Sequence, residues 1–444
     1  MSQPFEDIRG FVHRVRRAIL RSIVHPIAKN TLRLVGSQYI AAVIRLVTTV
    51  CAARMLTSVE FGTAALVMAY PTLMLSIFGM KSQIVTIKYL SVFRAQKHRD
   101  QLRGLCKLAY AIDLFPTVLV ALLVIYTAEW VSIHFYDLAG LSWLMVVYAA
   151  SAPLISLGGT SQAILSSHQE FPTLAFFVLL QPTVSLLCVV AFLGLGFGVA
   201  GMVLGLTIGR VVNSLGMNVV AVRVLYRDGS GFWWQGKIAS VRSLQQEFYG
   251  AIGWNYVLGA VSGLLDAAPL MLLGRYRPVE EVGFYRLAES MVSVARFLES
   301  SMGRVVYPVL SARLQSGAPG AVAGTLRKYT LRGGWPMALV PLLAALVIPS
   351  AVPLLFGSNY APMITGAQLL MVGASFNVLF FWIMPAYLAN NQFGVYTKCF
   401  IAYASVMLTA FWFAVEGWGF LGLAAVQALG RGVFLSIMAV PRLR

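Results

Sequence analysis

The chain of 444 residues has little charge and few of the motifs that carry chemistry. Asp, Glu, Lys and Arg make up 11% of it, against roughly 25% in a typical soluble domain. Acidic residues are scarce, at 16 against 34 Lys and Arg, and there are five histidines. The sequence contains no G-x4-G-K-[ST] phosphate loop, no H-E-x-x-H and no G-x-S-x-G. These absences argue against a soluble enzyme, a zinc hydrolase and a pump with its own ATPase.

Cysteine is also scarce, and the cysteines lie far apart. Each of the four falls in a different hydrophobic segment: Cys51, Cys106, Cys188 and Cys399. A disulfide framework or a zinc ligand set needs cysteines at characteristic spacings. We therefore expect packed free thiols, with no metal site and no cofactor.

Long apolar runs dominate what is present. Apolar residues make up 59% of the chain, and runs of the roughly 20 residues that cross a bilayer recur from Leu34 to Val440. The sequence therefore predicts an all-α polytopic membrane protein. Twelve transmembrane helices are expected, near residues 33–56, 61–80, 105–127, 140–165, 171–193, 198–225, 248–273, 281–303, 325–348, 362–389, 393–415 and 418–440.

Basic residues concentrate in every second connection. They gather in the N-terminal tail, residues 81–107, 223–242 and 304–332, and the C-terminal end, whereas the alternate loops contain almost none. This bias marks cytoplasmic segments, so both termini are predicted to be cytoplasmic. The formal charge of +18 has the same origin, and no nucleic-acid partner is expected because no soluble domain presents a basic face.

Four segments follow from this layout. Residues 1–32 form a basic tail, predicted to be an amphipathic helix on the cytoplasmic leaflet because its apolar and arginine side chains segregate. Residues 33–226 and 248–444 hold six spans each. Residues 227–247 between them contain Trp233, Trp234 and Lys237, which is typical of an interfacial linker.

The two six-span units share landmarks at a nearly constant offset. Arg54-x5-Glu60-x-Gly62 recurs 221 residues later as Arg275-x5-Glu281-x-Gly283. Four further pairs match in order: Phe115-Pro116 with Trp335-Pro336, His168–Phe171 with Asn390–Phe393, Gly196-Phe197 with Gly419-Phe420, and Gly209-Arg210 with Gly430-Arg431. Such a series indicates a duplicated unit. Because each copy holds an even number of spans, the copies have parallel topology and flank a shared cavity; a duplication that only packs is the alternative.

Two ionisable residues occupy mid-span positions at this same offset. Arg45 lies in the first predicted span and Asp266 in the seventh. A charge at mid-membrane costs roughly 2.5–3.5 kcal/mol, so each residue needs a partner or water. We expect them to face each other across the cavity or to form an ion pair, as a structural bridge or as a substrate or coupling-ion site.

A polar stripe marks the eighth span, inside the stretch Leu265–Arg304. Its members recur every three or four positions and share one helix face: Arg286, Glu289, Ser290, Ser293, Arg296, Ser300 and Gly303. This face is predicted to border a wet interior. Arg286 is spaced to pair with Glu289, and Arg296 with Glu299, within the helix.

Two further charged residues lie within the first six spans. Asp113 precedes Pro116 by one turn, where a helix break would free backbone carbonyls. Arg210 in the sixth span is expected to extend its side chain to the cytoplasmic surface.

The turn between the first two spans carries a family resemblance. Its sequence ARMLTSVEFGTAALVMAY (Ala53–Tyr70) resembles the signature ARxLGPxEFGxYALA of bacterial polysaccharide-unit flippases, with Thr57-Ser58 as a departure. The stretches DAAPLMLLGRYRPVEEVGFYRLAESM, RVVYPVLSARLQ (Arg304–Gln315) and Leu354–Gly357 resemble the same family. The resemblance implies the fold of the multidrug/oligosaccharidyl-lipid/polysaccharide exporter superfamily, in which two six-helix lobes alternate between inward-open and outward-open states in the bacterial inner membrane.

This resemblance implies a flippase and not an enzyme. Its cargo would be an undecaprenyl-pyrophosphate-linked oligosaccharide for lipopolysaccharide or exopolysaccharide biosynthesis. Membrane lipids would be partners, and a polysaccharide polymerase and export machinery are further candidates. Arginine suits a pyrophosphate because its planar fork donates two hydrogen bonds. The head group is therefore assigned to Arg45, Arg286 and Arg296, and the counter-charge or coupling role to Asp266, Glu289 and Asp113.

Two other functions stay open. One is a cation-coupled multidrug or small-molecule exporter of the same superfamily. The other is a membrane-embedded glycosyltransferase, polymerase or ligase, which the short outer loops and the absence of acidic nucleotide-sugar motifs disfavour.

Overall fold

A computed structural model of the chain describes residues 26–80, 82–315, 319–390 and 392–443. Within these ranges the chain is helical and contains no β-strand, which confirms the predicted fold class. Residues 1–25, where most of the amphipathic tail was predicted, lie outside them. The first lobe comprises α2 (Pro26–Met55), α3 (Ser58–Phe78), α4 (Gln83–Ala95), α5 (Arg99–Trp130), α6 (Ser142–Ala150), α7 (Ala152–Ser167), α8 (Phe171–Gly194) and α9 (Gly198–Arg227).

The second lobe follows two short 3-10 segments, Trp233–Gln235 and Ile238–Leu244. It comprises α10 (Gln245–Tyr276), α11 (Val279–Gln315), α12 (Pro319–Lys328), α13 (Trp335–Leu355), α14 (Ile364–Leu379), α15 (Ile383–Ala389) and α16 (Phe393–Leu443). Five-residue and six-residue π-helical segments, Val131–Phe135 and Tyr329–Gly334, extend α5 and precede α13.

Ten segments of the described chain are long and apolar enough to span a membrane. The longest, Gly394–Val440, contains a break at Gly419, where φ is 59° and ψ is −141°. The charged helix α11 is not among the ten. Each of the twelve predicted spans overlaps a helix or a pair of helices, and the number twelve itself stays a prediction.

The second predicted span ends earlier than its apolar run, and a helix that was not predicted follows it. Gly79 adopts an extended conformation (φ −75°, ψ 121°) directly after α3. The chain then restarts as α4, which packs against α5 and α7 of the same lobe. Helix α4 was not predicted because it lies within residues 81–107, which are rich in Lys and Arg and were expected to form a cytoplasmic connection.

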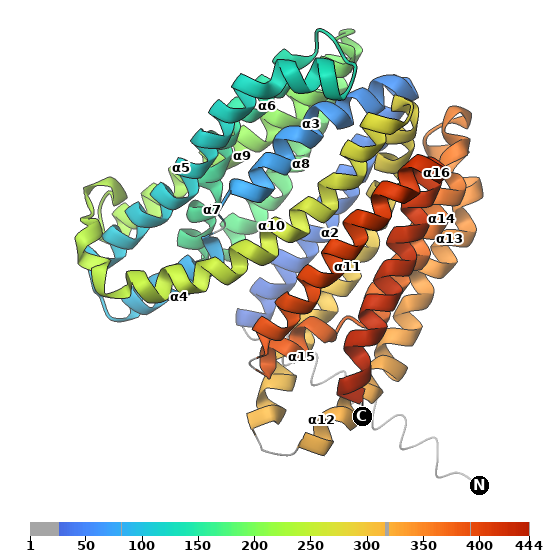
Figure 1. Ribbon diagram of the computed structural model, residues 1–444. Helices are drawn as coiled ribbons and strands as arrows, with labels where there is room; N and C mark the ends of the chain where they lie inside the picture. The colour runs from blue at the N-terminus through green and yellow to red at the C-terminus, as the bar shows by residue number, and fades with distance from the viewer. Residues whose placement is uncertain (1–25, 81, 316–318, 391, 444) are drawn as a thin grey trace, which may run out of the picture.

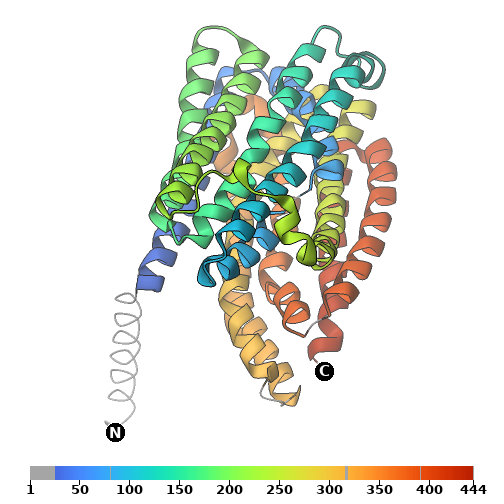
Figure 2. The ribbon, with the colours of Figure 1, turned by 90° about the vertical axis from the view of Figure 1, so that its left-hand side faces the viewer.

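The two lobes lie side by side and meet most closely at one end. In Figure 1 helices α4 to α9 of the first lobe lie at the left and centre, α13, α14 and α16 of the second lobe lie toward the right, and α10 of the second lobe runs between them from lower left to upper centre. Helix α3 packs against both α10 and α11, which joins the lobes. Figures 1 and 2 show α12 and the end of α16 at the opposite end from the α2–α3 turn. We call the end that holds this turn the upper end.

The repeated glycines form a close interlobe contact at the upper end. A Cβ atom on Gly62 would lie 2.1 Å from the carbonyl oxygen of Val279 and 3.0 Å from the backbone nitrogen of Gly283. A Cβ atom on Gly283 would lie 2.7 Å from the carbonyl oxygen of Ser58. Both copies of the motif therefore need glycine, because the N-terminal turns of α3 and α11 touch each other through their backbones.

The repeated arginines tie the same end together. Arg54 of the first lobe donates through Nε to the Leu355 carbonyl of the second at 2.8 Å. Arg275 of the second lobe donates to the His134 carbonyl of the first at 3.1 Å. In both copies of the repeat motif, the arginine thus donates a hydrogen bond to a backbone carbonyl of the other lobe.

The repeated glutamates cap helices. Glu60 and Thr57 form a reciprocal capping box at the start of α3, with contacts of 2.9 Å and 3.2 Å. Such a box satisfies backbone donors that the first turn leaves unpaired. Glu281 accepts from the backbone nitrogen of Phe420 at 2.8 Å, beside the break in α16. The glutamates therefore shape the turns, while the arginines and glycines join the lobes.

Candidate substrate cavity

Two adjoining cavities lie between the lobes, with volumes of about 430 and 440 Å³. They share six lining residues and form one continuous hollow: Met68, Tyr148, Arg210, Arg286, Glu289 and Arg296. A cavity this size, lined by apolar walls with a few polar groups, is typical of a small-molecule site.

The C-terminal wall of the hollow is the polar stripe of α11. Ser290 and Ser293 line the first cavity together with the charged residues of the stripe. Their hydroxyls donate at 2.6 Å to the backbone carbonyls of Leu287 and Ser290. Five of the seven residues of the predicted stripe therefore border an interior hollow, where they can meet water instead of lipid: Arg286, Glu289, Ser290, Ser293 and Arg296.

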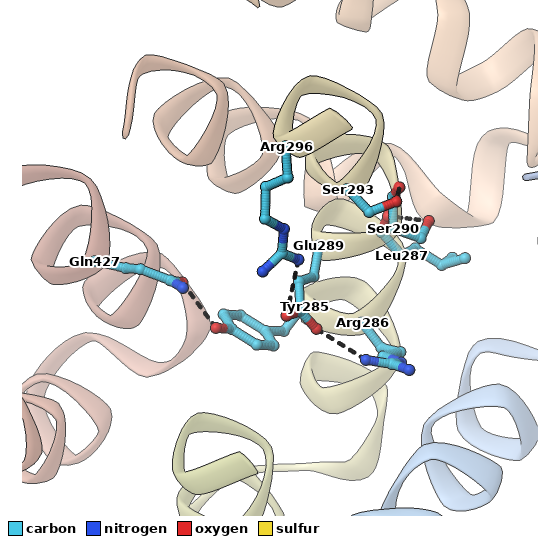
Figure 3. Close-up of polar contacts among 8 residues, drawn as sticks. All are labelled: Tyr285, Arg286, Leu287, Glu289, Ser290, Ser293, Arg296 and Gln427. Carbon is cyan, nitrogen blue, oxygen red and sulfur yellow. Dashed lines mark hydrogen bonds and ion pairs between the residues drawn. The ribbon is translucent and has the colours of Figure 1, made fainter. Parts of the chain in front are cut away.

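Glu289 bridges the two arginines of this wall (Figure 3). Its Oε2 lies 2.9 Å from Nη1 of Arg286, and its Oε1 lies 3.3 Å from Nη2 of Arg296. The glutamate side chain is 10% exposed, whereas those of Arg286 and Arg296 are 48% and 38% exposed. The predicted pair Arg286–Glu289 forms. The expected pairing of Arg296 with Glu299 is wrong, because Arg296 turns back two helical turns to Glu289.

Behind Glu289 the wall is fastened to the rest of its lobe. Tyr285 is buried at 1% exposure, and its hydroxyl donates to Oε1 of Gln427 on α16 at 2.8 Å. Figure 3 shows this tyrosine reaching away from α11 toward α16. The bond holds the face of α11 that carries Glu289 in a fixed orientation.

Arg45 and Asp266 line different parts of the hollow. Arg45 on α2 borders the first cavity and Asp266 on α10 the second. These two described residues do not form an ion pair with each other. Asp266 instead lies within Coulombic range of Arg296. Of the two expected arrangements, the ion pair does not form, and both residues line the shared interior.

Arg210 is a cavity residue that sequence reasoning misplaced. It borders both central cavities and a smaller one of about 150 Å³ inside the first lobe. Its Nη1 donates to the Tyr148 hydroxyl, and its guanidinium carbon lies 5.4 Å from the centre of that ring. The expected extension to the membrane surface is wrong. The sequence held a sign of the interior position, because Gly209-Arg210 matches Gly430-Arg431 in the repeat, and Arg431 also lines a cavity, together with Glu289 and Arg296.

Asp113 lies apart from the arginines, in a cavity of about 360 Å³ that has no arginine among its described lining residues. Its carboxylate accepts from Oγ1 of Thr160 at 2.7 Å and from the backbone nitrogen of Ser82 at 3.3 Å. Ser82 immediately precedes α4, so Asp113 anchors the positive end of that helix. The predicted break at Pro116 is wrong, since α5 continues through it.

Comparison with known proteins places this architecture among transporters. The family model described as "Polysaccharide biosynthesis protein" matches residues 27–313. No curated protein sequence matches the chain significantly. The chain is similar in structure to an inward-facing multidrug resistance MATE family transporter of the MOP superfamily, with a TM-score of 0.72 and 12% identity over 90% of this chain and 93% of that one.

Two further solved structures share the fold. The lipid II flippase MurJ in an inward closed conformation superimposes with a TM-score of 0.69 and 11% identity, covering 91% of this chain and 86% of that one. A MOP superfamily transporter from Pyrococcus furiosus, described as having a binding pocket of reverse polarity that suggests a different function, gives 0.60 and 15% over 93% and 94%. At these identities the likeness concerns the fold alone.

Proposed function

Since the chain belongs to the polysaccharide biosynthesis protein family and has the fold of MOP superfamily transporters, we propose that it flips undecaprenyl-pyrophosphate-linked oligosaccharide units across the bacterial inner membrane. It would act by alternating access and have no enzymatic activity of its own. Polymerase and export machinery would then use the units for surface polysaccharide.

The charge of the interlobe hollow carries this proposal. Its lining contains four arginines, at positions 45, 210, 286 and 296, and two acids, at 266 and 289. A pyrophosphate has the opposite charge, and arginine is the side chain best suited to it because two parallel N–H donors meet two phosphate oxygens. Under this proposal Asp266 and Glu289 act as counter-charges that keep the empty cavity stable.

The positions of the interlobe contacts support loading from the cytoplasm. The bonds from Arg54 to Leu355 and from Arg275 to His134 hold the lobes together at the upper end. The basic helices and linker lie toward the opposite end, which the distribution of Lys and Arg assigns to the cytoplasm. The hollow would then receive cargo from the cytoplasmic leaflet and release it once the upper contacts open.

The same charge disfavours the cation-coupled drug exporter. A cationic drug would meet an excess of arginine in the hollow, and a like charge in a partly dry cavity is repelled strongly. The glycosyltransferase class is disfavoured because the matched family and its structural neighbours are transporters and flippases.

Deletion of the gene tests the proposal. We expect loss of surface polysaccharide, with lipid-linked units that remain on the cytoplasmic face and are detected by extraction and mass spectrometry. Arg45→Ala on a plasmid is expected not to restore export, whereas Gly36→Ala is expected to restore it, because a Cβ there meets nothing within 4 Å. Normal surface polysaccharide together with drug hypersensitivity would overturn the flippase proposal in favour of an exporter.

A further inference from the structure

The two walls of the hollow differ in how their arginines are neutralised. On the C-terminal wall, Glu289 lies within ion-pair distance of both Arg286 and Arg296. On the N-terminal wall, neither Arg45 nor Arg210 forms an ion pair with a carboxylate among the described residues. The uncompensated positive charge therefore lies on the first lobe.

Arg45 and Arg210 flank a common piece of wall. Both line the first cavity, and Gln181 and Ser185 on α8 line it with them. Helix α8 packs extensively against α2, which carries Arg45, and against α9, which carries Arg210. The wall thus presents two guanidinium groups, an amide and a hydroxyl, all of which can donate hydrogen bonds to an oxyanion.

The helices of this wall approach closely enough to fix its geometry. A Cβ atom on Gly209, beside Arg210, would lie 2.0 Å from Oγ of Ser185. A Cβ atom on Gly205 would lie 2.7 Å from the backbone nitrogen of Val189. Because α8 and α9 touch through small residues, the donors that they carry cannot move apart independently.

Tyr148 orients Arg210 without neutralising it. The tyrosine accepts a hydrogen bond from Nη1 and places its ring beneath the guanidinium. A ring face and a hydroxyl hold the planar fork in position, but neither supplies a full negative charge. A bound dianion would supply it.

We propose that the pyrophosphate of the cargo binds first on the N-terminal wall, between Arg45 and Arg210, with Gln181 and Ser185 as additional donors. Arg210 is then a determinant of anion binding, and the α11 arginines, which Glu289 already holds, contribute less in this state. This inference rests on the proposed function and specifies where in the hollow the head group lies.

Binding of undecaprenyl pyrophosphate to the purified full-length protein in nanodiscs tests the assignment. Arg45→Ala and Arg210→Ala are each expected to weaken binding at least about tenfold, the loss of one charge-assisted contact. Arg210→Lys should weaken it less, because it keeps the charge and loses the fork. Arg286→Ala is expected to change the affinity less than about threefold, because Glu289 already holds this arginine. Thermal unfolding of each variant shows whether it is folded.

The outcomes separate the two proposals. Suppose that the wild type binds the lipid and that Arg210→Ala binds it equally well, or that Arg286→Ala weakens the affinity more than Arg210→Ala does. Either result would overturn the N-terminal-wall assignment and leave the flippase proposal standing. If Arg210→Ala does not fold, Arg210→Gln and Tyr148→Phe take its place, and wild-type affinity in both would overturn the assignment equally. Failure of the wild type to bind the lipid at all would overturn both proposals.

Discussion

Replacing Glu289 by Gln is expected to strengthen anion binding. The same change is expected to lower the stability of the fold and the rate of export. Gln keeps the size of the side chain but removes the negative charge that both α11 arginines share. The two guanidinium groups would then lack this shared carboxylate, and Asp266 would be the acid that remains among the described residues lining the hollow. A bound pyrophosphate would then meet four arginines and one acid, instead of four arginines and two acids.

The magnitudes follow from the geometry of the bridge. Removal of one partner from a fully buried ion pair costs roughly 3–5 kcal/mol. Here the glutamate is 10% exposed but its partners are 48% and 38% exposed, so solvent screening reduces the loss of stability to about 1–3 kcal/mol. One additional charge-assisted contact is worth roughly 1.5–3 kcal/mol, which predicts at least tenfold tighter binding of undecaprenyl pyrophosphate. Export should fall, because Glu289 would no longer be present to pair again with Arg286 and Arg296 when the cargo leaves.

Three measurements on one set of variants check this expectation: thermal unfolding, lipid binding in nanodiscs, and restoration of surface polysaccharide in a deletion strain. Glu289→Asp is the matched control, since it retains the charge and should stay closer to the wild type in affinity. Weaker or unchanged binding by Glu289→Gln would refute the competition between Glu289 and the cargo. Tighter binding together with normal export would refute the requirement for recapture.

Two other substitutions give distinct expected outcomes. Gly62→Val should abolish export without changing lipid affinity more than about twofold. A Cβ at Gly62 would lie 2.1 Å from the Val279 carbonyl oxygen and would force the upper ends of the lobes apart. Export at the level of the Gly36→Ala control would contradict this. Asp113→Asn should lower the unfolding temperature, because it weakens the buried contacts to Thr160 and Ser82, and should leave lipid binding intact; a loss of binding with unchanged stability would instead place Asp113 in the cargo or coupling site.

Helices and their duplication could be predicted because they depend on information that is local in the sequence. Apolar runs define spans, and the offset of 221 residues relates the turn at Gly62 to the turn at Gly283. The stripe on α11 is also a local property, since residues three and four apart share a helix face. These features required no knowledge of how the lobes pack.

Contacts between side chains were harder to predict, because equivalence in a repeat does not give distance from the symmetry axis. The same offset relates Gly62 to Gly283, which touch, and Arg45 to Asp266, which do not pair. The direction of Arg210 depends on Tyr148, which lies 62 residues away in sequence. Sequence spacing therefore identified a polar interior but not which charges neutralise one another.

The contact between Gly62 and Gly283 also has an evolutionary consequence. Two copies of one surface that touch at equivalent residues form an isologous interface, the arrangement of a twofold homodimer. In a homodimer both walls of the central hollow would be identical. Here Arg286 and Glu289 on α11 correspond, at the repeat offset, to Ala65 and Met68 on α3, which also line the hollow. Because the two halves are joined in one chain, their walls can differ in sequence, so that one wall carries two arginines bridged by Glu289 while the other carries Arg45 and Arg210.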